Sequence, residues 1–265
     1  MDASDRISSG GNGMITAYHR PHSLDEALTL LSRRNPATYP LGGGTLLSHG
    51  GPEAIEVVDL QGLGLDHIEH VGNAIQVGAT VTLQALLEYE DLPPALQPAL
   101  KLEAPLNLRN AATVAGTIVA ADGRSTFTTI LLALDARLTF MNPQSGSSDL
   151  GDFLPLRARI LPGTLITGIE VPTNANLAFE YVSRTPADKP IVCAALAQWQ
   201  SGRTRLALGG YGSTPLLAMD GTEADGLEAA ARNVFHEASD PWGSADYRMD
   251  VAATLAGRCL EALTP

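Results

Sequence analysis

The first part of the chain alternates between strand-like and helix-like spacing of its apolar residues. Residues 15–18 read as a short strand, and residues 24–31 place their apolar side chains on one face of a helix. Ser23 and Glu26 have the spacing of a capping box, which predicts that this helix begins directly after Ser23. Residues 37–41 read as the next strand. A strand, a helix and a strand in this order favour a small parallel sheet.

The same patterns predict the elements that follow, up to residue 172. Strands are expected over residues 55–60, 74–79, 137–141 and 165–172, and helices over residues 83–89, 93–102 and 128–134. Thr82 is the expected N-cap of the first of these helices, and Ser125 or Thr126 of the last.

Beyond residue 172 the pattern changes to consecutive strands followed by helices. Strands over residues 179–182, 191–200 and 203–208 predict a three-stranded antiparallel sheet, and helices are expected over 223–238 and 247–262. The predicted fold class is α+β, with a first region over residues 14–172 and a C-terminal α+β subdomain over residues 173–265. Residues 1–13 are small and polar, which is typical of a disordered extension.

Composition narrows the classes of function. The formal net charge of −12 argues against nucleic acid as a partner, because binding phosphates requires a basic face. No stretch approaches the roughly 18 apolar residues of a membrane span, and the N-terminus lacks the features of a secretory signal, so a cytoplasmic location is expected.

The cysteines and histidines give no pattern of a metal site. Cys193 and Cys259 are the only cysteines, too few for an iron–sulfur cluster that takes four, and we expect free thiols rather than a disulfide. His67 and His70 lie three apart around Ile68-Glu69, which we interpret as a surface turn. No metal site is therefore predicted.

A glycine loop stands at the end of the predicted strand over residues 37–41. It reads Leu41-Gly42-Gly43-Gly44-Thr45-Leu46. Successive exposed amides in such a loop can form a concave anion site, and a phosphate or pyrophosphate is the expected guest. A P-loop is excluded because no Lys-Ser/Thr pair follows, and the spacing also differs from the Rossmann fingerprint. A simple flexible turn is the alternative.

A second stretch of small residues covers residues 110–118. It carries Gly116 and the hydroxyls of Thr113 and Thr117, and it has no large apolar stripe that would favour an amphipathic helix. Backbone amides could approach a phosphate here, with both threonines as additional donors. Tight packing of a strand is the alternative.

Together these loops resemble the FAD-binding medium subunit of the molybdenum hydroxylases, the family of carbon monoxide dehydrogenase and xanthine dehydrogenase flavoproteins. The family's first loop has the form Ala-Gly-Gly-x-Ser/Thr-Leu-Leu and its second Arg-Asn-x-Ala-Thr-Ile/Val-Gly-Gly-Asn-Ile, and the matching stretches here begin at Leu41 and Arg109. Leu-Leu-Ala-Leu-Asp-Ala at 131–136 and Ser-Ala-Asp-Tyr-Arg at 244–248 are also similar to family motifs. The resemblance runs from about residue 15 to about residue 263.

This resemblance implies a two-part FAD-binding region of the PCMH type over residues 14–172, with FAD as cofactor and no catalytic acid or base. It also implies an electron-transfer oxidoreductase subunit, which works with a large molybdopterin subunit and a small iron–sulfur subunit. The cofactor-binding residues that it implies are Leu41, Gly42, Gly43, Gly44, Thr45, Leu46, Thr113, Ala115, Gly116, Thr117, Ser125, Thr126, Asp188 and Lys189. Of these, Asp188 and Lys189 would lie near the isoalloxazine ring, where the family often has Asp followed by an aromatic residue.

Three departures from the family pattern bear on the binding of FAD. Ala115 and Thr117 replace a glycine and an asparagine of the second loop, and Thr126 stands where the family has an aspartate. If the backbone at Ala115 had a positive φ, its Cβ would cost about 1 kcal/mol or more. A degenerate scaffold subunit with weak or no FAD binding is therefore the alternative function, and a stand-alone flavin reductase or oxidase is a third.

Overall fold

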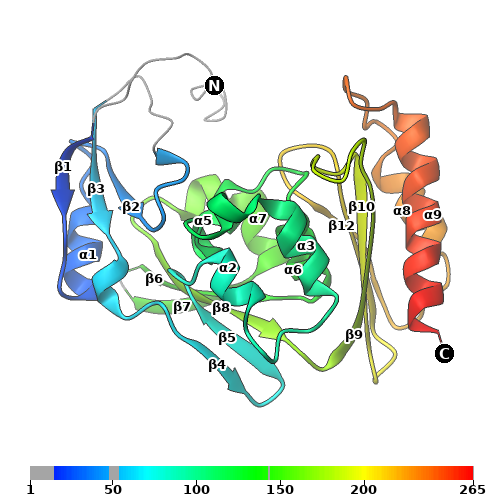
Figure 1. Cartoon of the computed structure of the whole chain (residues 1–265), viewed down its shortest axis with the longest axis horizontal. Helices are drawn as coiled ribbons and strands as arrows, with labels where there is room; N and C mark the ends of the chain where they lie inside the picture. Colours follow the sequence, from blue (N-terminus) through cyan, green and yellow to red (C-terminus); the bar gives the residue numbers. More distant parts are fainter. Residues whose placement is uncertain (1–14, 48–53, 143, 265) are drawn as a thin grey trace.

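The computed structural model describes residues 15–47, 54–142 and 144–264. The predicted disordered extension over residues 1–13 lies outside the described residues. Three sheets follow one another across the molecule, with most of the helices around the central and C-terminal sheets (Figure 1). The mixture of helices with separate sheets confirms the predicted α+β class.

The N-terminal sheet is parallel, as predicted. Its strand order is β1 (Ile15–His19), β3 (Ile55–Asp59) and β2 (Thr38–Leu41). Between β1 and β2 the chain forms α1 (Leu24–Leu31), whose N-cap Ser23 accepts a hydrogen bond from the amide of Glu26 at 3.2 Å. The apolar face of α1 packs against Val58 of β3, and the glycine loop begins at the end of β2.

The central sheet is antiparallel throughout, in the order β4-β5-β8-β6-β7. Its strands are β4 (Ile68–Val71), β5 (Ala74–Gly78), β6 (Arg137–Asn142), β7 (Gln144–Asp149) and β8 (Leu165–Pro172). The helices between them are α2 (Leu83–Leu87), α3 (Leu96–Glu103), α4 (Leu106–Arg109), α5 (Val114–Ala120), α6 (Thr126–Ala133) and α7 (Leu150–Ile160).

The C-terminal sheet has the order β12-β11-β10-β9, and all of its pairs are antiparallel. Its strands are β9 (Ala175–Val182), β10 (Val192–Trp199), β11 (Thr204–Gly209) and β12 (Leu216–Gly221). Helices α8 (Leu227–Val234) and α9 (Ala245–Leu263) cover the side of this sheet that faces away from the central part (Figure 1).

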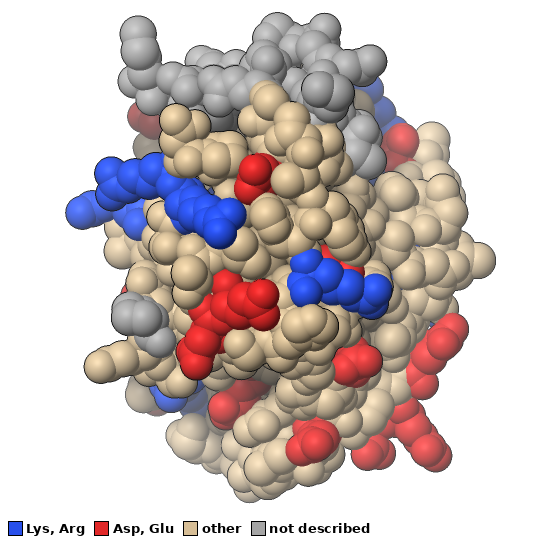
Figure 2. Space-filling view, turned by 90° about the vertical axis from the view of Figure 1, so that its left-hand side faces the viewer, with Lys and Arg blue, Asp and Glu red and all other residues tan. Residues whose placement is uncertain are grey.

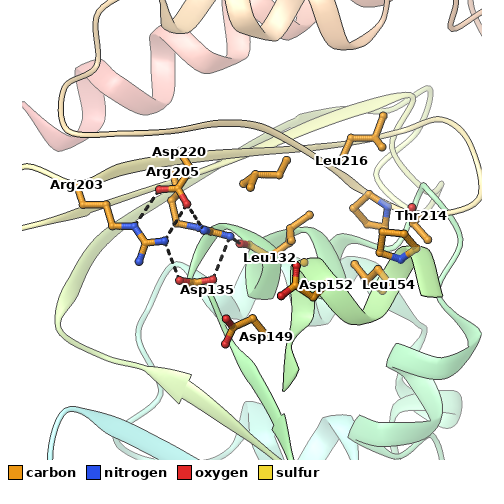
Figure 3. A pocket seen from close by; sticks show the side chains of 14 residues that line it. Leu132, Asp135, Asp149, Asp152, Leu154, Arg203, Arg205, Thr214, Leu216 and Asp220 are labelled. Atoms are coloured by element: carbon orange, nitrogen blue, oxygen red, sulfur yellow. Dashed lines mark hydrogen bonds and ion pairs between the residues drawn. The ribbon is translucent and has the colours of Figure 1, made fainter. Parts of the chain in front are cut away.

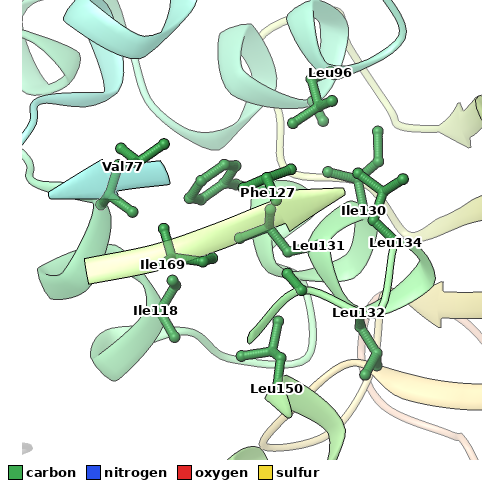
Figure 4. Close-up of a cluster of buried hydrophobic side chains, with 14 of the residues drawn as sticks. Val77, Leu96, Ile118, Phe127, Ile130, Leu131, Leu132, Leu134, Leu150 and Ile169 are labelled. Carbon is green, nitrogen blue, oxygen red and sulfur yellow. The ribbon is translucent and has the colours of Figure 1, made fainter. Parts of the chain in front are cut away.

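The core of the molecule centres on α6. Every residue of this helix is buried, and its Phe127, Ile130 and Leu131 pack among side chains of the central sheet and of neighbouring helices (Figure 4). Helix α6 also contacts β10 and β11 of the C-terminal sheet. Because one helix is shared by two sheets, the segment just before it is held at the junction between the first region and the C-terminal strands.

The interpretation of residues 110–118 as a non-helical stretch is wrong. Residues 114–120 form α5, which begins after its N-cap Thr113. Val114 and Ile118, four residues apart, are its buried positions. Two buried side chains and a cap are enough here because α5 packs into an existing core, so a longer apolar stripe is not needed.

Further elements differ from the sequence prediction, among them the helices α4 and α7, which were not predicted. Residues 68–71, expected as a turn, form β4, and the polar residues 144–149 form β7, an edge strand with no apolar alternation to reveal it. The C-terminal sheet has a fourth strand, β12, whose Leu216 and Leu217 are exposed. Helix α8 is shorter than the predicted helix over residues 223–238.

Both cysteines are free thiols, as predicted, and both are buried. Burial raises the pKa of each thiol to about 12. Since the thiolate is the reactive form, neither residue is a candidate nucleophile. Over the ranges that the structure describes, no helix combines the length and the apolar character needed to cross a membrane.

Candidate functional site

The glycine loop and the second loop lie in direct contact. A Cβ on Gly43 would stand 1.5 Å from the carbonyl oxygen of Ala111, and a Cβ on Gly42 would stand 2.7 Å from Oγ1 of Thr113. Both distances are far below van der Waals contact, so only glycine lets the two backbones approach this closely. The structure therefore brings together the two stretches that the sequence singled out.

The glycine loop offers hydrogen-bond donors. The amide N–H groups of Gly42, Gly43 and Gly44 have no partner among the described residues. Gly44 has a φ of 68°, the left-handed conformation that glycine adopts without strain. Gly43 and Leu46 are exposed, and Leu41, Gly42, Gly44 and Thr45 are partly exposed. Neighbouring free amides in a turn of this kind form a concave site for an anion.

The second loop offers the site a packing surface rather than hydrogen-bond donors. The amides of Val114 and Ala115 donate to Val81 and Ala79, and that of Gly116 donates to Oγ1 of Thr113 at 3.2 Å. Thr113 is buried, and the hydroxyl of Thr117 donates to the carbonyl of Thr113 at 2.8 Å. The expectation that these amides are free for a phosphate is wrong, because each of them already donates to an acceptor within the protein.

The backbone strain that a positive φ would cause at Ala115 is absent. Ala115 lies inside α5, and Asp135 is the only non-glycine residue with a positive φ among those described. The Cβ of Ala115 therefore fits the helical backbone without cost. Gly116 next to it is exposed, so a ligand can approach the backbone there.

Ser125 and Thr126 are committed to internal contacts at the start of α6. Ser125 is the N-cap, as predicted, and accepts from the amide of Thr128 at 3.2 Å. Thr126 donates to the carbonyl of Ala99 at 2.7 Å. Both residues are buried and both hydroxyls also reach Glu103. Their place in the structure favours the capping role that the sequence had left beside ligand contact.

Glu103 at the end of α3 is a functional candidate that sequence reasoning missed. Its Oε2 accepts from the amide of Phe127 and the hydroxyl of Ser125, both at 2.9 Å. Burial raises the pKa of Glu103 above its ordinary value, although these bonds and the charge of Lys189 act in the opposite direction. No sequence pattern marks this residue, because its partners lie more than twenty residues further along the chain.

The raised pKa of Glu103 predicts how Glu103→Gln changes stability with pH. A folded-state pKa above the unfolded value means that wild-type stability falls as pH rises through the unfolded pKa, near 4.5. The amide variant lacks this loss, so its free energy of unfolding minus that of wild type should increase from about pH 4 to about pH 8. Urea unfolding at several pH values measures this difference, with the exposed Glu90→Gln as control. A difference independent of pH would contradict it.

The loop over residues 184–190, which contains Asp188 and Lys189, lies against the segment between α5 and α6. Nζ of Lys189 is 3.4 Å from Oδ1 of Asp122, and its carbonyl accepts from Nη2 of Arg124 at 2.7 Å. The amide of Asp188 donates to Thr185 within the loop at 3.1 Å. The contacts to the 184–190 loop thus come from residues that directly follow the C-terminal end of α5. The glycine loop contacts the residues just before the N-terminal end of the same helix.

The length of α5 sets the spacing between these two parts of the site. Its seven residues rise about 10 Å along the helix axis. A ligand that reaches from the glycine loop to residues 184–190 must therefore be an extended molecule with an anionic part near Gly43.

A pocket of about 450 Å³ lies elsewhere, between the end of α6, α7 and the strands β11 and β12 (Figure 3). None of the predicted site residues lines it. Arg203 reaches Asp135 at 2.9 Å and Asp220 at 2.8 Å, and Arg205 pairs with the same two carboxylates. The hydrogen bond from Arg203 holds the pKa of Asp220 below its ordinary value, against the effect of burial. This cluster ties α6 to the C-terminal sheet.

The charges do not form a basic face on the side of the molecule with the N-terminal sheet. Figure 2 shows Lys and Arg side chains there interspersed with Asp and Glu on a largely uncharged surface. Across the described part of the chain, no group of three or more His, Cys, Asp or Glu residues could hold a metal ion.

Comparison with known proteins places this geometry in a family. Residues 12–174 match the model of the FAD binding domain in molybdopterin dehydrogenase. The chain belongs to this family. It is 31% identical to the protein YgfM of Escherichia coli K12 over 248 residues, which cover 91% of this chain and 94% of the relative.

This member of the FAD-binding family is also similar to subunits of carbon monoxide dehydrogenase. It is 27% identical to the carbon monoxide dehydrogenase medium chain of Afipia carboxidovorans over 276 residues, covering 92% of this chain and 95% of the relative. The crystal structure of the Cu,Mo-CO dehydrogenase contains a chain that matches with a TM-score of 0.81 and 26% identity, covering 95% of this chain and 98% of that one. The resemblance inferred from the loop motifs is confirmed.

FAD is the cofactor of this family, and the site fits it. The free amides of Gly42, Gly43 and Gly44 suit a pyrophosphate, and the exposed Gly116 leaves room beside it.

Proposed function

We propose that this chain is the FAD-binding electron-transfer subunit of a molybdopterin-dependent hydroxylase or dehydrogenase complex. FAD supplies the redox chemistry, taking up electrons from iron–sulfur clusters on another chain and delivering them to an acceptor. This chain would bind the cofactor and set its orientation. The observation that carries the proposal is the pair of touching loops at one end of α5, with the 184–190 loop at the other.

The proposed division of work among the residues follows from their positions. Leu41, Gly42, Gly43, Gly44, Thr45 and Leu46 form the loop whose amides bind the pyrophosphate. Thr113 caps α5 and supports Ala115, Gly116 and Thr117, which present a small surface to the cofactor. Ser125 and Thr126 fix the start of α6. Asp188 and Lys189 would lie beside the isoalloxazine ring and tune it.

Other chains are expected to complete the electron path. The relatives carry the names of medium chains of carbon monoxide dehydrogenase and of glyceraldehyde dehydrogenase, which are oxidoreductases. By analogy we propose a large molybdopterin-binding partner and a small iron–sulfur partner. The two buried cysteines of this chain cannot ligate a cluster.

A degenerate scaffold without FAD is the second candidate, favoured by the replacements at Ala115, Thr117 and Thr126. The helical backbone at Ala115 removes one reason for it. The replacement at Thr126 still favours this candidate, because its hydroxyl is bound to Ala99 inside the protein.

The test is an absorption spectrum of the purified chain after incubation with FAD and desalting. We expect a flavin band that remains with the protein at close to one FAD per chain. The control is the same experiment with FMN, which lacks the pyrophosphate and adenosine and should be largely removed. If no flavin is retained even after incubation at high FAD concentration, the electron-transfer role is wrong and the scaffold function takes its place.

A further inference from the structure

Arg124 connects the two parts of the candidate site. It belongs to the segment between α5 and α6, yet its guanidinium reaches the 184–190 loop. Its Nη2 donates to the carbonyl of Lys189 at 2.7 Å and its Nε to the carbonyl of Pro190 at 3.0 Å. The guanidinium carbon lies 4.3 Å from the ring centroid of Trp242. Two hydrogen bonds and a stacked ring fix both the position and the plane of the group.

The base from which Arg124 extends is itself fixed. The amide of Gly123 donates to Gly212 at 2.9 Å, and the amide of Gly210 donates to the carbonyl of Gly123 at 2.6 Å. A Cβ on Gly123 would stand 1.9 Å from the carbonyl oxygen of Tyr211. The backbone before Arg124 is therefore fixed against the loop after β11, and this also fixes the Cα position from which the Arg124 side chain extends.

The 184–190 loop has few other ties to this part of the molecule. The hydrogen bonds of Ser183 and Asp188 end on Thr185, inside the loop itself. The ion pair of Lys189 with Asp122 is long, at 3.4 Å, and both side chains are exposed to solvent. Exposed pairs of this kind contribute about 1 kcal/mol or less. Another tie of the loop leads away from α5, because Arg184 stacks on Trp242 at 4.8 Å and donates to the carbonyl of Pro241 at 3.4 Å. Arg124 is therefore the main link between the loop and the segment that follows α5.

The turn that carries Trp242, the stacking partner of Arg124, is also held in place. Buried Arg248 donates to the carbonyl of Gly243 at 2.7 Å and to that of Ile191 at 3.4 Å. It thereby joins the turn that carries Trp242 to the residue that follows Pro190. The 184–190 loop itself has no hydrogen bond to Arg248 in the described part of the chain.

We propose that Arg124 is a positioning residue for the flavin ring: it sets the place of the 184–190 loop, and with it the approach of Asp188 and Lys189 to the ring. The proposal rests on the proposed function. Arg124 lies past the C-terminal end of α5, whereas the loops proposed for the pyrophosphate lie at the N-terminal end of this helix. It therefore should affect how the ring behaves far more than how tightly FAD binds.

The matched variants are Arg124→Gln and Arg184→Gln. Arg184 also stacks on Trp242, at 4.8 Å, but its hydrogen bond goes to Pro241 at 3.4 Å and not to Lys189 or Pro190. Both variants lose one positive charge at the same indole ring. Only Arg124→Gln releases the loop, so the pair separates positioning from charge.

With FAD bound, we expect Arg124→Gln to change the rate constant for reoxidation of the reduced flavin by ferricyanide about tenfold, while the Kd for FAD stays within about threefold. The fine structure of the flavin absorption band should shift in the same variant. Arg184→Gln keeps both hydrogen bonds of Arg124, so its effects on the rate constant and on the band should be clearly smaller. Arg124→Lys keeps the charge without the planar fork, so it should resemble Arg124→Gln.

Proteolysis gives a readout that needs no turnover. The loop holds one bond open to trypsin, between Arg184 and Thr185, because Lys189 is followed by Pro190. In the FAD-bound protein, cleavage there should be about tenfold faster in Arg124→Lys than in wild type, since the released loop opens more often.

The outcomes separate this inference from the proposed function. If wild type retains no FAD, the proposed function is wrong. If wild type retains FAD and the flavin of Arg124→Gln or Arg124→Lys matches it in spectrum and reoxidation, the positioning role is wrong. Equal effects of Arg124→Gln and Arg184→Gln would also overturn it, because charge alone would then explain them.

Discussion

Replacing Gly43 by alanine should abolish tight binding of FAD. The new Cβ would stand 1.5 Å from the carbonyl oxygen and 2.4 Å from the carbonyl carbon of Ala111, and backbone atoms cannot rotate away. The glycine loop would have to separate from the second loop. Losing two hydrogen bonds to a charged group costs about 3 kcal/mol or more, so the Kd for FAD should rise at least about 100-fold.

The matched control for this prediction is Gly62→Ala. A Cβ on Gly62 would meet nothing nearer than the carbonyl oxygen of Pro21 at 3.9 Å, and its φ is not in the left-handed range. We expect wild-type FAD binding from it. Equilibrium dialysis gives the Kd, and circular dichroism establishes that each variant is folded. Wild-type affinity in folded Gly43→Ala would show that the close contact between the loops does not form the binding site.

Replacing Arg248 by alanine should cause a large loss of stability. Its guanidinium is fully buried and donates to the carbonyl of Ala238 at 2.6 Å and to Oδ1 of Asp240 at 2.7 Å, besides Gly243 and Ile191. The variant removes four hydrogen bonds and opens a cavity. We expect the free energy of unfolding to fall by about 3 kcal/mol or more.

Arg232→Ala is the control, because Arg232 pairs with Asp250 between α8 and α9 at the surface. An exposed pair of this kind should contribute about 1 kcal/mol or less. Urea unfolding measures both variants. The Arg248 effect should also fade in acid: despite burial, the hydrogen bond from Arg248 holds the pKa of Asp240 below its ordinary value, so the stabilisation is lost as pH falls. A loss in Arg248→Ala no greater than in the control would contradict the assignment.

Local patterns predicted most of the regular structure near the glycine loop. The cap at Ser23, the face of α1 and the strand before Gly42 depend on neighbours within a few residues, and the structure has all three. The polar edge strand β7 and the short helix α5 were not predicted, because each is stabilised by contacts with other segments and not by its own apolar pattern.

The candidate site divides in the same way. The triple glycine and the stretch over residues 110–118 could be found in the sequence, since backbone freedom and small side chains are written in residue type. Glu103 and Arg124 could not be found, because a lone charged residue in a helix end or a loop carries no signal until its partners are known.

The sequence by itself determined the α+β class, the parallel N-terminal sheet and the family, because spacing and glycine placement are local properties. Only the tertiary structure decided that Gly43 lies on Ala111 and that Arg124 holds carbonyls 65 and 66 residues away. It also decided that the amides of Val114, Ala115 and Gly116 donate to acceptors within the protein and are not free for a phosphate. Such contacts depend on how three sheets pack around α6, and hydrogen-bond partners brought together by packing leave no mark on local residue order.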